Sequence, residues 1–539
     1  MPKILVADKI AEQGIERLKA APGVTYDVRH GLSTSELASI VGDYDGMLIR
    51  SAVKVTRDVF ANVGKLAVIA RAGVGVDNVD LDAATAVGVL VLNTPDANTL
   101  STAEHSIALM LALYRHIPAA HQHVTAGQWN RSDFQGQQLA GKTLGIVGFG
   151  RIGRTVAQRA RAFEMNVLAY DPFISSQTDL RDPGAPELVP DLDTLLRKSD
   201  CVTLHSSLTD ETRHMLGAEQ FALMKPTAIL INCARGALID EAALADALNE
   251  GRLGGAGIDV YAKEPPVGSP LLSARNVVLT PHLAASTSEA QAQVSVDAVD
   301  ALLAYLIDGE IRSAVNVTGL PGHLTPRLQA YLDLCCRMGA LLSPWCASGV
   351  DRVCATVCGE SLQEIAGTLS WQAMVSVLRP HLDVRLNVIN AKEQAKQRGI
   401  TVEHATKTSN PDVPDALTLT VETQGKTHII EGTIFADGKP RVLSIDGYKM
   451  ELVPAQSMAL IFNDDQPGVI GLVGREFGDA GINIADMALS RRDKTALMVL
   501  KLDEAMPDAL RDALRDKNPP ILSVCTVTLP PVGDGHAGP

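Results

Sequence analysis

Short apolar runs alternate with segments of helical apolar spacing from the first residues to about residue 315. Apolar runs bounded by turn residues are typical of buried strands, and their alternation with helices predicts parallel sheets built from βα units. We therefore predict two Rossmann-like, doubly wound α/β lobes. The predicted strands are residues 4–7, 46–49, 66–70, 144–147, 167–170, 228–233, 257–260 and 277–280, and the predicted helices are residues 11–20, 98–117, 151–163 and 283–306.

The order of these segments predicts that the first lobe is built from two separate parts of the chain. The long helix from residue 98 carries the chain out of this lobe, and the alanine-rich helix through Leu306 is long enough to bring it back. We expect a first lobe formed by residues 1–96 and 287–317, and a second lobe formed by residues 97–286.

After residue 317 the pattern changes twice. Residues 318–452 combine a helix at 331–342 with strands at 350–357, 417–421 and 428–434, and with a polar stretch at 403–415 that we expect to be a loop. Residues 453–530 follow a βαββαβ order, which predicts a ferredoxin-like fold. The last ten residues have the composition of a flexible tail. Four modules suit a chain of 539 residues, which is too long for one hydrophobic core.

Composition and charge argue against several classes of function. The formal net charge is -14 and clustered cations are missing, so we expect no nucleic-acid partner. No apolar segment is long enough to span a bilayer, and no basic and apolar leader precedes the first strand, so we expect a cytoplasmic protein without a membrane partner. The eight cysteines lack paired C-x-x-C spacing, which favours reduced thiols and no metal site.

A glycine-rich turn follows the predicted strand at 144–147. Gly148, Gly150 and Gly153 have the G-x-G-x-x-G spacing that lets backbone N–H groups and a helix N-terminus approach a pyrophosphate. A lone match also occurs in unrelated glycine turns, but here a helix and a second strand follow, and that strand ends at Asp171. A carboxylate at this point accepts hydrogen bonds from both ribose hydroxyls and repels a 2′-phosphate. The sequence therefore predicts NAD rather than NADP.

Charged residues follow several strands of both lobes. Arg50 and Arg71 each stand just past an apolar run in the first lobe, next to a glycine loop. Ligands of open α/β sheets bind at the carboxyl ends of strands, so these two arginines are placed to meet an anion, although either one alone is more often a solvated surface residue.

The second lobe offers an arginine, a carboxylate and a histidine at one sheet edge, namely Arg235, Glu264 and His282. Oxidation of a 2-hydroxy acid needs these three types. A guanidinium binds the carboxylate and polarises the carbonyl oxygen, an imidazole accepts the hydroxyl proton, and a carboxylate fixes the imidazole tautomer. Each residue also has a purely structural alternative, as an ion pair, a loop residue or a buried core histidine.

The motifs at residues 148–153, 232–236, 259–266 and 280–283 resemble those of the D-isomer-specific 2-hydroxyacid dehydrogenase family, and more closely its long phosphoglycerate dehydrogenases. The resemblance implies that the first lobe binds substrate, that the second binds NAD, and that the catalytic residues are Arg235, Glu264 and His282. It places Asp259 at the nicotinamide carboxamide and Arg151 beside the diphosphate. The implied cofactor residues are Gly148, Gly150, Arg151, Ile152, Gly153, Asp171, Ser206, Cys233, Asp259 and His282.

The resemblance also implies a phosphorylated 2-hydroxy acid substrate, with NAD-dependent oxidation of 3-phospho-D-glycerate to 3-phosphooxypyruvate at the entry to L-serine biosynthesis. It implies that phosphate is bound by Arg50, Arg71 and an Arg131 contributed by a second subunit of a homodimer or homotetramer. The implied substrate residues are Arg50, Ser51, Arg71, Val74, Gly75, Asn98, Arg131 and Arg235. The chain departs from many relatives at Ser207 and Ala284, and neither departure removes a reacting group.

The last module resembles an ACT domain, and residues 318–452 resemble the intervening domain of the same family. The implied effector is L-serine bound between two ACT domains, with candidate ligands Asn463, Asp465 and Asn483. A dimerisation module without a working effector site fits the same residues.

Two alternative functions remain open from the sequence. A glyoxylate or hydroxypyruvate reductase, or another D-2-hydroxyacid dehydrogenase, would keep the same catalytic trio but would not need arginines around a phosphate. An NAD(H)-sensing transcriptional corepressor built on the same scaffold would also keep the trio. The ACT-like module and the phosphate arginines argue against the corepressor.

Overall fold

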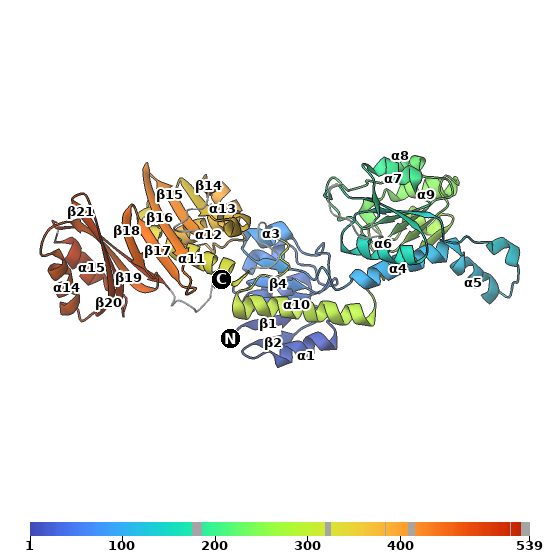
Figure 1. Cartoon of the computed structure of the whole chain (residues 1–539). Helices are drawn as coiled ribbons and strands as arrows, with labels where there is room; N and C mark the ends of the chain where they lie inside the picture. Colours follow the sequence, from blue (N-terminus) through green and yellow to red (C-terminus); the bar gives the residue numbers. More distant parts are fainter. Residues whose placement is uncertain (175–185, 318–324, 383, 408–414, 518, 530–539) are drawn as a thin grey trace.

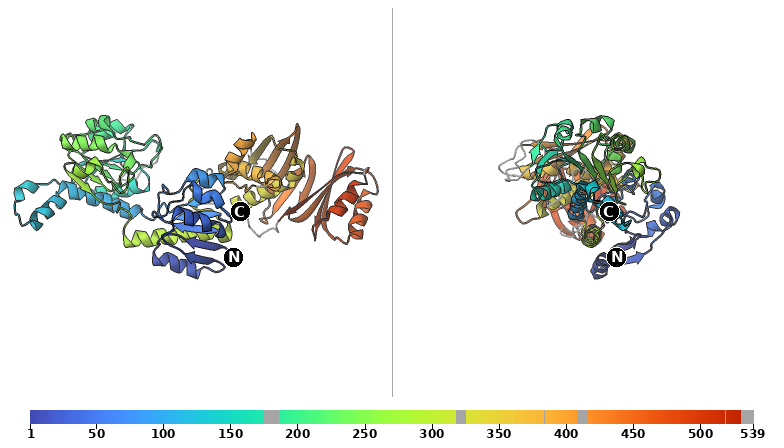
Figure 2. Two further views of the ribbon diagram at one scale, coloured as in Figure 1. Left: turned by 180° about the vertical axis from the view of Figure 1, so that it is seen from behind. Right: turned by 90° about the vertical axis from the view of Figure 1, so that its right-hand side faces the viewer.

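The computed structural model describes residues 1–174, 186–317, 325–382, 384–407, 415–517 and 519–529. Four modules lie in a row (Figure 1), and the view from behind shows the same order (Figure 2). The glycine-motif lobe stands at one end, the first lobe follows it, and the two C-terminal modules complete the row. The predicted tail at 530–539 lies outside the described residues.

The first lobe contains five parallel strands in the order β2-β1-β3-β4-β5. Helix α10 (Ser288–Asp308), which comes much later in the chain, packs its residues Val294 and Leu302 into one core with Ile4 and Val68. The strands are β1 (Lys3–Val6), β2 (Thr25–Val28), β3 (Gly46–Ile49), β4 (Val68–Arg71) and β5 (Leu90–Leu92), and the other helices are α1 (Glu12–Ala20), α2 (Thr34–Ile40) and α3 (Leu81–Ala86).

The start of the helix predicted at residue 283 is wrong, because α10 begins at Ser288. Residues 283–287 form a turn instead, in which the N–H of Ser286 donates to the carbonyl of Leu283. The N–H groups of Leu283 and Ala284 donate to the carboxylate of Asp259. A side chain of another strand end therefore binds the backbone donors at this point, and the helix starts later.

The second lobe contains seven parallel strands in the order β12-β11-β10-β9-β6-β7-β8, which confirms the doubly wound prediction. Helix α4 (Thr99–Tyr114) leads into this lobe and packs against its sheet. The strands are β6 (Thr143–Val147), β7 (Asn166–Tyr170), β8 (Glu187–Leu188), β9 (Cys201–Leu204), β10 (Ile229–Asn232), β11 (Gly255–Ile258) and β12 (Val277–Leu279). The helices between these strands are α6 (Arg151–Ala162), α7 (Leu192–Lys198), α8 (Ala218–Leu223) and α9 (Glu241–Asn249).

The helix predicted at 98–117 is interrupted near its end. His116 has a left-handed backbone with φ of 49°, so α4 stops at Tyr114 and the chain continues as α5 (Ile117–Thr125) and a 3-10 turn at Arg131–Phe134. These segments form an arm that points away from the first lobe (Figure 1). The division between the lobes near residues 97 and 286 remains our proposal.

The third module contains a six-stranded mixed sheet in the order β14-β13-β15-β16-β17-β18. The loop predicted at 403–415 is wrong over its first part, because β14 (Thr401–Lys407) pairs in parallel with β13 (Arg352–Cys358). The side chains of this edge strand are mostly exposed, so the apolar alternation that marks a strand is missing. Residues 408–414 lie outside the described residues. The other elements are α11 (Pro326–Leu342), α12 (Ala366–Leu378), α13 (Ala391–Arg398), β15 (Ala416–Thr423), β16 (Lys426–Ile434), β17 (Pro440–Ile445) and β18 (Tyr448–Leu452).

The last module has the predicted βαββαβ order and an antiparallel sheet in the order β20-β21-β19-β22, which confirms the ferredoxin-like fold. One face of this sheet shares a core with the third module, where Leu460 and Val499 pack with Leu334 and Met338. The elements are β19 (Gln456–Asp464), α14 (Val469–Asp479), β20 (Ile484–Arg492), β21 (Thr495–Leu502), α15 (Asp508–Arg515) and β22 (Ile521–Leu529).

The third module also contacts the first lobe directly. Asn387 donates from Nδ2 to the carbonyl of Gly88 at 2.8 Å, and Ile389 packs into the core that contains α10. The last module therefore connects to the first lobe through packed elements. No helix in the described part of the chain is both long and apolar enough to cross a membrane.

Candidate active site

A cavity of about 820 Å³ lies between the two Rossmann-like lobes, at the carboxyl ends of their strands. Both lobes contribute charged side chains to its wall, so the cavity is complete only when the lobes face each other. The predicted residues that line it are Arg50, Ser51, Arg71, Val74, Gly75, Asn98, Arg235, Glu264 and His282.

His282 and Glu264 form a hydrogen-bonded pair at the second-lobe wall. Oε2 of Glu264 lies 2.8 Å from Nδ1 of His282, and the other carboxylate oxygen accepts from the N–H of Tyr261. Glu264 follows β11 and His282 follows β12, so two adjacent parallel strands deliver the pair to one edge. When Nδ1 donates to this carboxylate, Nε2 of the imidazole is free of a proton and can act as a general base.

The loop of His282 is held by Asp259, which follows β11 and is fully buried. His282 has a left-handed backbone with φ of 54°, and its N–H donates to the carbonyl of Asp259. The carboxylate of Asp259 accepts hydrogen bonds from the N–H of Leu283 at 2.7 Å and of Ala284 at 2.9 Å. A histidine with a left-handed backbone is uncommon. Here Asp259 accepts hydrogen bonds from the backbone N–H groups of His282, Leu283 and Ala284, so none of these three donors of the turn is left without an acceptor.

Arg235 reaches from the second lobe to the first. Its Nε lies 3.4 Å from Oδ2 of Asp77, and its Nη1 donates to the carbonyl of Ala234. The guanidinium passes so close to Gly75 that a Cβ at that glycine would overlap it. The absence of a side chain at Gly75 thus leaves room for the cation beside the backbone of the glycine loop.

Arg71 is a partly buried cation in the wall of the cavity. Burial and the nearby positive charge of Arg235 lower the pKa of Arg71 to about 10. Its Nε is buried and has no hydrogen-bond partner among the described residues. A buried cation with an unsatisfied donor is costly until an anion arrives, and Arg71 lines the cavity, so it is suited to bind one there.

The loop that carries Arg50 is fixed by Asp8, a residue that the sequence analysis did not single out. Oδ2 of Asp8 accepts hydrogen bonds from the N–H of Arg50 at 3.1 Å and of Ala52 at 3.0 Å. Asn78 donates from Nδ2 to the carbonyl of Arg50 at 2.7 Å. These contacts hold the loop in place, while Lys54 adds a further cation to the cavity wall.

The glycine loop after β4 offers backbone donors to the same cavity. The loop is held at Gly73 by Thr94, whose hydroxyl accepts from the N–H of Gly73 at 2.9 Å. Within the described part of the chain, the N–H groups of Val74 and Gly75 have no acceptor. Oδ1 of Asn98 is also buried and without a partner among these residues. The cavity thus has both donors and an acceptor available for a ligand.

The glycine turn fits a dinucleotide. Gly148 has a left-handed φ of 90°, and a Cβ at Gly153 would overlap the carbonyl of Gly148, so both positions require glycine. Open space surrounds the position of a Cβ at Gly150, where a pyrophosphate would approach the backbone. Asp171 lies at the mouth of this turn, because its Oδ2 accepts from the N–H of Phe149 at 2.9 Å.

The other predicted cofactor residues surround this turn. Arg151 begins α6 and its Nε lies 2.5 Å from Oδ1 of Asp96, in the segment that joins the lobes. Ile152 follows it and is half-buried, Ser206 donates from its hydroxyl to the carbonyl of Val147, and Cys233 is buried at the end of β10.

Comparison with known proteins agrees with this geometry. Family models match the D-isomer specific 2-hydroxyacid dehydrogenase NAD binding domain at residues 107–284, the D-3-phosphoglycerate dehydrogenase intervening domain at 327–446 and the ACT domain at 457–518. The D-3-phosphoglycerate dehydrogenase of Methanocaldococcus jannaschii is 40% identical over 531 residues, which are 98% of this chain and 100% of that relative. The chain belongs to the D-3-phosphoglycerate dehydrogenase family.

Solved structures resemble the two-lobed part of this family member. A protein of Thermus thermophilus is 36% identical with a TM-score of 0.53, and the match covers 58% of this chain and 99% of that one. A glyoxylate reductase of Paecilomyes thermophila is 32% identical with a TM-score of 0.53, covering 58% and 97%. The dehydrogenase core is thus shared with glyoxylate reductases, whereas the intervening and ACT domains are features of the phosphoglycerate dehydrogenase family.

The two departures from many relatives leave the reacting groups in place. Ala284 is buried in the core of the NAD-binding lobe while its N–H binds Asp259. Ser207 is exposed, and its carbonyl accepts from the hydroxyl of Thr212.

Arg131 is the one predicted substrate residue that does not lie in the cavity. It begins the 3-10 turn at the end of the arm and is exposed. The arm points away from the first lobe of its own chain (Figure 1), so Arg131 meets neither Arg50 nor Arg71 within one chain.

The candidate effector residues of the ACT domain are separated within one chain. Asn463 pairs with Ala496 on β21, whereas Ile484, next to Asn483, pairs with Leu502. Leu502 stands six positions after Ala496 along strand β21, which is about 20 Å. Oδ1 of Asn463 is buried without a partner among the described residues, Asp465 is paired with Arg491 at 2.8 Å and Asn483 donates to Asp503.

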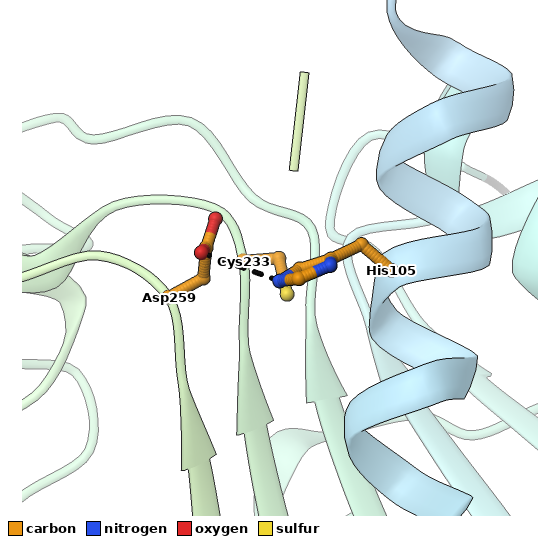
Figure 3. Close-up of side chains that lie close together, drawn as sticks. All are labelled: His105, Cys233 and Asp259. Carbon is orange, nitrogen blue, oxygen red and sulfur yellow. Dashed lines mark ion pairs between the residues drawn. The ribbon is translucent and has the colours of Figure 1, made fainter. Parts of the chain in front are cut away.

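His105 and Thr280 were missed by the sequence analysis, although both contact Asp259. His105 comes from α4 and lies beside Asp259 and Cys233 (Figure 3). One ligand-type atom from each of these three side chains lies within 4.8 Å of the others. The carboxylate of Asp259 is already hydrogen-bonded to two side chains and two backbone N–H groups, and burial raises the pKa of the Cys233 thiol to about 12. These two facts favour a hydrogen-bonded cluster over a metal site.

Proposed function

We propose that this chain oxidises 3-phospho-D-glycerate to 3-phosphooxypyruvate with NAD, the first step of L-serine biosynthesis. The observation that carries the proposal is the cavity between the lobes, where the His282–Glu264 pair faces a wall that contains Arg50, Arg71 and Arg235. The relatives that match the whole length of the chain are named for the same activity.

The roles of the reacting groups follow from their contacts. His282 accepts the proton of the substrate 2-hydroxyl at Nε2, and Glu264 stabilises the imidazolium that forms. Arg235 binds the substrate carboxylate and polarises the C2 oxygen as it becomes a carbonyl. The N–H groups of Val74 and Gly75 hold the carboxylate from the other side, since they have no acceptor among the described residues.

The phosphate lies against Arg50 and Arg71 on the substrate lobe. A chain with a net charge of -14 needs such a local cluster of cations to bind a phosphorylated acid. Ser51 and Asn98 complete this wall of the cavity. The requirement for a phosphate separates this activity from that of a glyoxylate or hydroxypyruvate reductase.

The cofactor site is the glycine turn together with Asp171. NAD bound there supplies the hydride acceptor for the oxidation. Gly150 leaves room for the diphosphate, Asp171 binds the ribose hydroxyls, and Ser206 and Cys233 lie at the neighbouring strand ends.

The arm suggests how a second subunit takes part. Its apolar side chains Ile117, Val124 and Trp129 are exposed by 53%, 53% and 78%, and large exposed apolar side chains on one segment are typical of an interface. We propose that the arm packs on a second copy of the chain and places Arg131 at the phosphate of that copy, in a homodimer or homotetramer.

The ACT domain suggests regulation by a small molecule. Because Asn463 and Asn483 lie at opposite ends of one sheet, a site that uses both must combine two ACT domains. We propose L-serine, the amino acid made by the pathway, as the effector bound between them by Asn463, Asp465 and Asn483.

The deciding experiment is NAD-dependent turnover of 3-phosphoglycerate compared with unphosphorylated D-glycerate and, in reverse, with glyoxylate, each with and without L-serine. A kcat/KM for 3-phosphoglycerate at least about 10²-fold above that for D-glycerate supports the proposal, since leaving buried cations without the phosphate that they bind has an effect of that size. Equal efficiencies on both would assign the chain to the reductases, and intact NAD binding without any turnover would favour a corepressor.

A further inference from the structure

A chain of polar contacts leads from helix α4 to the loop of His282, and Figure 3 shows its contact between His105 and Asp259. Nε2 of His105 lies 3.1 Å from Oγ1 of Thr280 and 3.3 Å from Oδ1 of Asp259. The hydroxyl of Thr280 donates to the same carboxylate oxygen at 2.6 Å. Since that hydroxyl hydrogen is used, its oxygen can accept from the Nε2–H of His105. The contacts therefore run from His105 through Thr280 to Asp259.

Asp259 passes this arrangement on to the catalytic loop. Its two carboxylate oxygens accept from the backbone N–H groups of Leu283 and Ala284, the two residues that follow His282. Its carbonyl accepts from the N–H of His282 itself. The left-handed turn at His282, on which the direction of the imidazole depends, is thus built around one buried carboxylate.

His105 does not line the cavity between the lobes, and Nε2 of its imidazole contacts Thr280 and Asp259. It stands on α4, which begins at Thr99 directly after the segment that joins the lobes. The side chain of His105 therefore links helix α4, at the junction of the lobes, to the residues that hold the loop of His282.

We propose that His105 is a positioning residue for catalysis, which acts through Thr280 and Asp259 to hold His282 in the conformation that pairs with Glu264. This inference rests on the proposed dehydrogenase activity and adds to it a residue that the catalytic trio does not include. Without the donor at His105, the carboxylate of Asp259 and the hydroxyl of Thr280 each lose one of the contacts that orient them. The imidazole of His282 then spends less time in reach of the substrate hydroxyl.

The test uses the full-length enzyme and four single variants. His105→Leu removes the donor, and His105→Gln keeps an N–H donor at a similar distance along the side chain. Thr280→Val removes the intermediate hydroxyl with little change of shape. His30→Leu, at an exposed histidine that does not line the cavity, is the matched control. The measurements are kcat and KM with 3-phosphoglycerate, the NAD dissociation constant and the thermal midpoint.

The expected result is a loss of kcat of about 10-fold or more in His105→Leu and in Thr280→Val, with KM and NAD affinity within about 2-fold, because small displacements of a base reduce turnover more than binding. His105→Gln recovers most of the loss. A fifth variant that combines His105→Leu with Thr280→Val is no slower than the slower of these two single variants, since both changes break the same path. His30→Leu has the wild-type kcat.

Three results would overturn the inference. The first is a wild-type kcat in His105→Leu, and the second is an equal loss of kcat in His105→Gln and His105→Leu. The third is an affinity for NAD that falls in parallel with kcat, because this result would place His105 in the cofactor site. If the wild-type enzyme oxidises a different D-2-hydroxy acid, the proposed substrate is wrong, but the same ratios measured with that acid still test His105. If no acid is turned over, a crystal structure of His105→Leu decides, because an unchanged left-handed His282 bonded to Glu264 contradicts the inference.

Discussion

Oε2 of Glu264 lies 2.8 Å from Nδ1 of His282, and this contact joins the ends of two adjacent parallel strands. The pair is half exposed to the cavity, so its geometry is set by the loops rather than by surrounding core. Glu264→Gln keeps the size of the side chain but removes the charge that stabilises an imidazolium. We expect kcat to fall by about 10²-fold or more.

The affinity for NAD in Glu264→Gln is expected to stay near the wild-type value, because Glu264 contacts only the base and its loop. Glu250→Gln, at an exposed glutamate paired with Arg252, is the matched control and should leave kcat unchanged. His282→Ala sets the lower limit of activity. A Glu264→Gln variant as active as the control would remove Glu264 from the catalytic group.

Gly75 tests whether Arg235 must lie against the backbone of the glycine loop. A Cβ at Gly75 would overlap the guanidinium of Arg235 and crowd Oδ2 of Asp77. Since the end of a long side chain moves easily, we expect Gly75→Ala to fold normally and to displace Arg235. The expected loss in kcat/KM is about 10-fold or more with a nearly unchanged thermal midpoint.

The control for this variant is Gly471→Ala, in helix α14 of the ACT domain, where open space surrounds the added methyl group. Alanine favours a helix by about 1 kcal/mol relative to glycine, so we expect this variant to fold normally. Since the position lies outside the cavity, its turnover should equal that of the wild type. If both alanine variants behave alike in turnover, the contact between Gly75 and Arg235 is without consequence.

We expect Arg71 to lower the stability of the ligand-free fold and to strengthen the binding of the phosphorylated substrate. Its charge is buried, its Nε is unpaired among the described residues, and burial with the repulsion from Arg235 lowers its pKa to about 10. Arg71→Met keeps the apolar stem and removes the charge. We expect a higher thermal midpoint without ligand, by a few degrees or roughly 1 kcal/mol, together with a KM for 3-phosphoglycerate at least about 10-fold higher.

Thermal shift measurements with and without 3-phosphoglycerate separate the two effects of Arg71→Met. The ligand should raise the midpoint of the wild-type enzyme far more than that of the variant, because only the wild type has the cation that the phosphate needs. A lower midpoint together with an unchanged KM would show that Arg71 is a structural residue.

The buried Asp259 predicts a dependence of stability on pH. Burial alone would raise its pKa, but the hydrogen bonds from His105, Thr280, Leu283 and Ala284 outweigh burial and lower the pKa from the usual 3.8 to about 2. A carboxyl group with a lowered pKa in the folded state stabilises the fold above its unfolded pKa, and this contribution disappears as the pH falls from about 4 to about 2.

The ionised Asp259 contributes about 2 kcal/mol at neutral pH by this linkage. We therefore expect Asp259→Asn to have a lower thermal midpoint than the wild type at pH 7, with a difference that narrows steadily below about pH 4. Asp300→Asn, at a half-exposed carboxylate paired with Arg17, is the control. A difference between wild type and Asp259→Asn that is the same at pH 7 and pH 3 would contradict the lowered pKa.

The sequence predicts the two doubly wound lobes and most of the cavity. The apolar runs indicate the strands of the lobes, and the polar residues that follow these runs indicate the side chains of the cavity. Arg235, Glu264 and His282 each stand a few residues past an apolar run, so a parallel sheet brings them to one edge. His105 could not be found in this way, since a polar residue within a helix gives no sign of which strand ends lie beside it. The edge strand β14 was missed because backbone pairing, and not apolar alternation, holds it in place.

The contacts that a residue makes with a second chain also cannot be predicted from the sequence of one chain. Arg131, which we propose to act in the cavity of a second subunit, can be tested by substitution. It is exposed at the end of the arm, outside the cavity of its own chain. We expect Arg131→Ala to raise the KM for 3-phosphoglycerate by about 10-fold, with a smaller effect on the turnover of unphosphorylated acids, because the variant has one cation fewer to bind the phosphate.

Mixed oligomers show from which chain Arg131 acts. An Arg131→Ala chain is combined with a His282→Ala chain, which has an intact Arg131 but no base. If Arg131 acts across the interface, the mixed oligomer contains one cavity with both His282 and Arg131, so activity with a low KM returns although each variant alone lacks it. If Arg131 acts within its own chain, the mixture shows only the high KM of the Arg131→Ala chain.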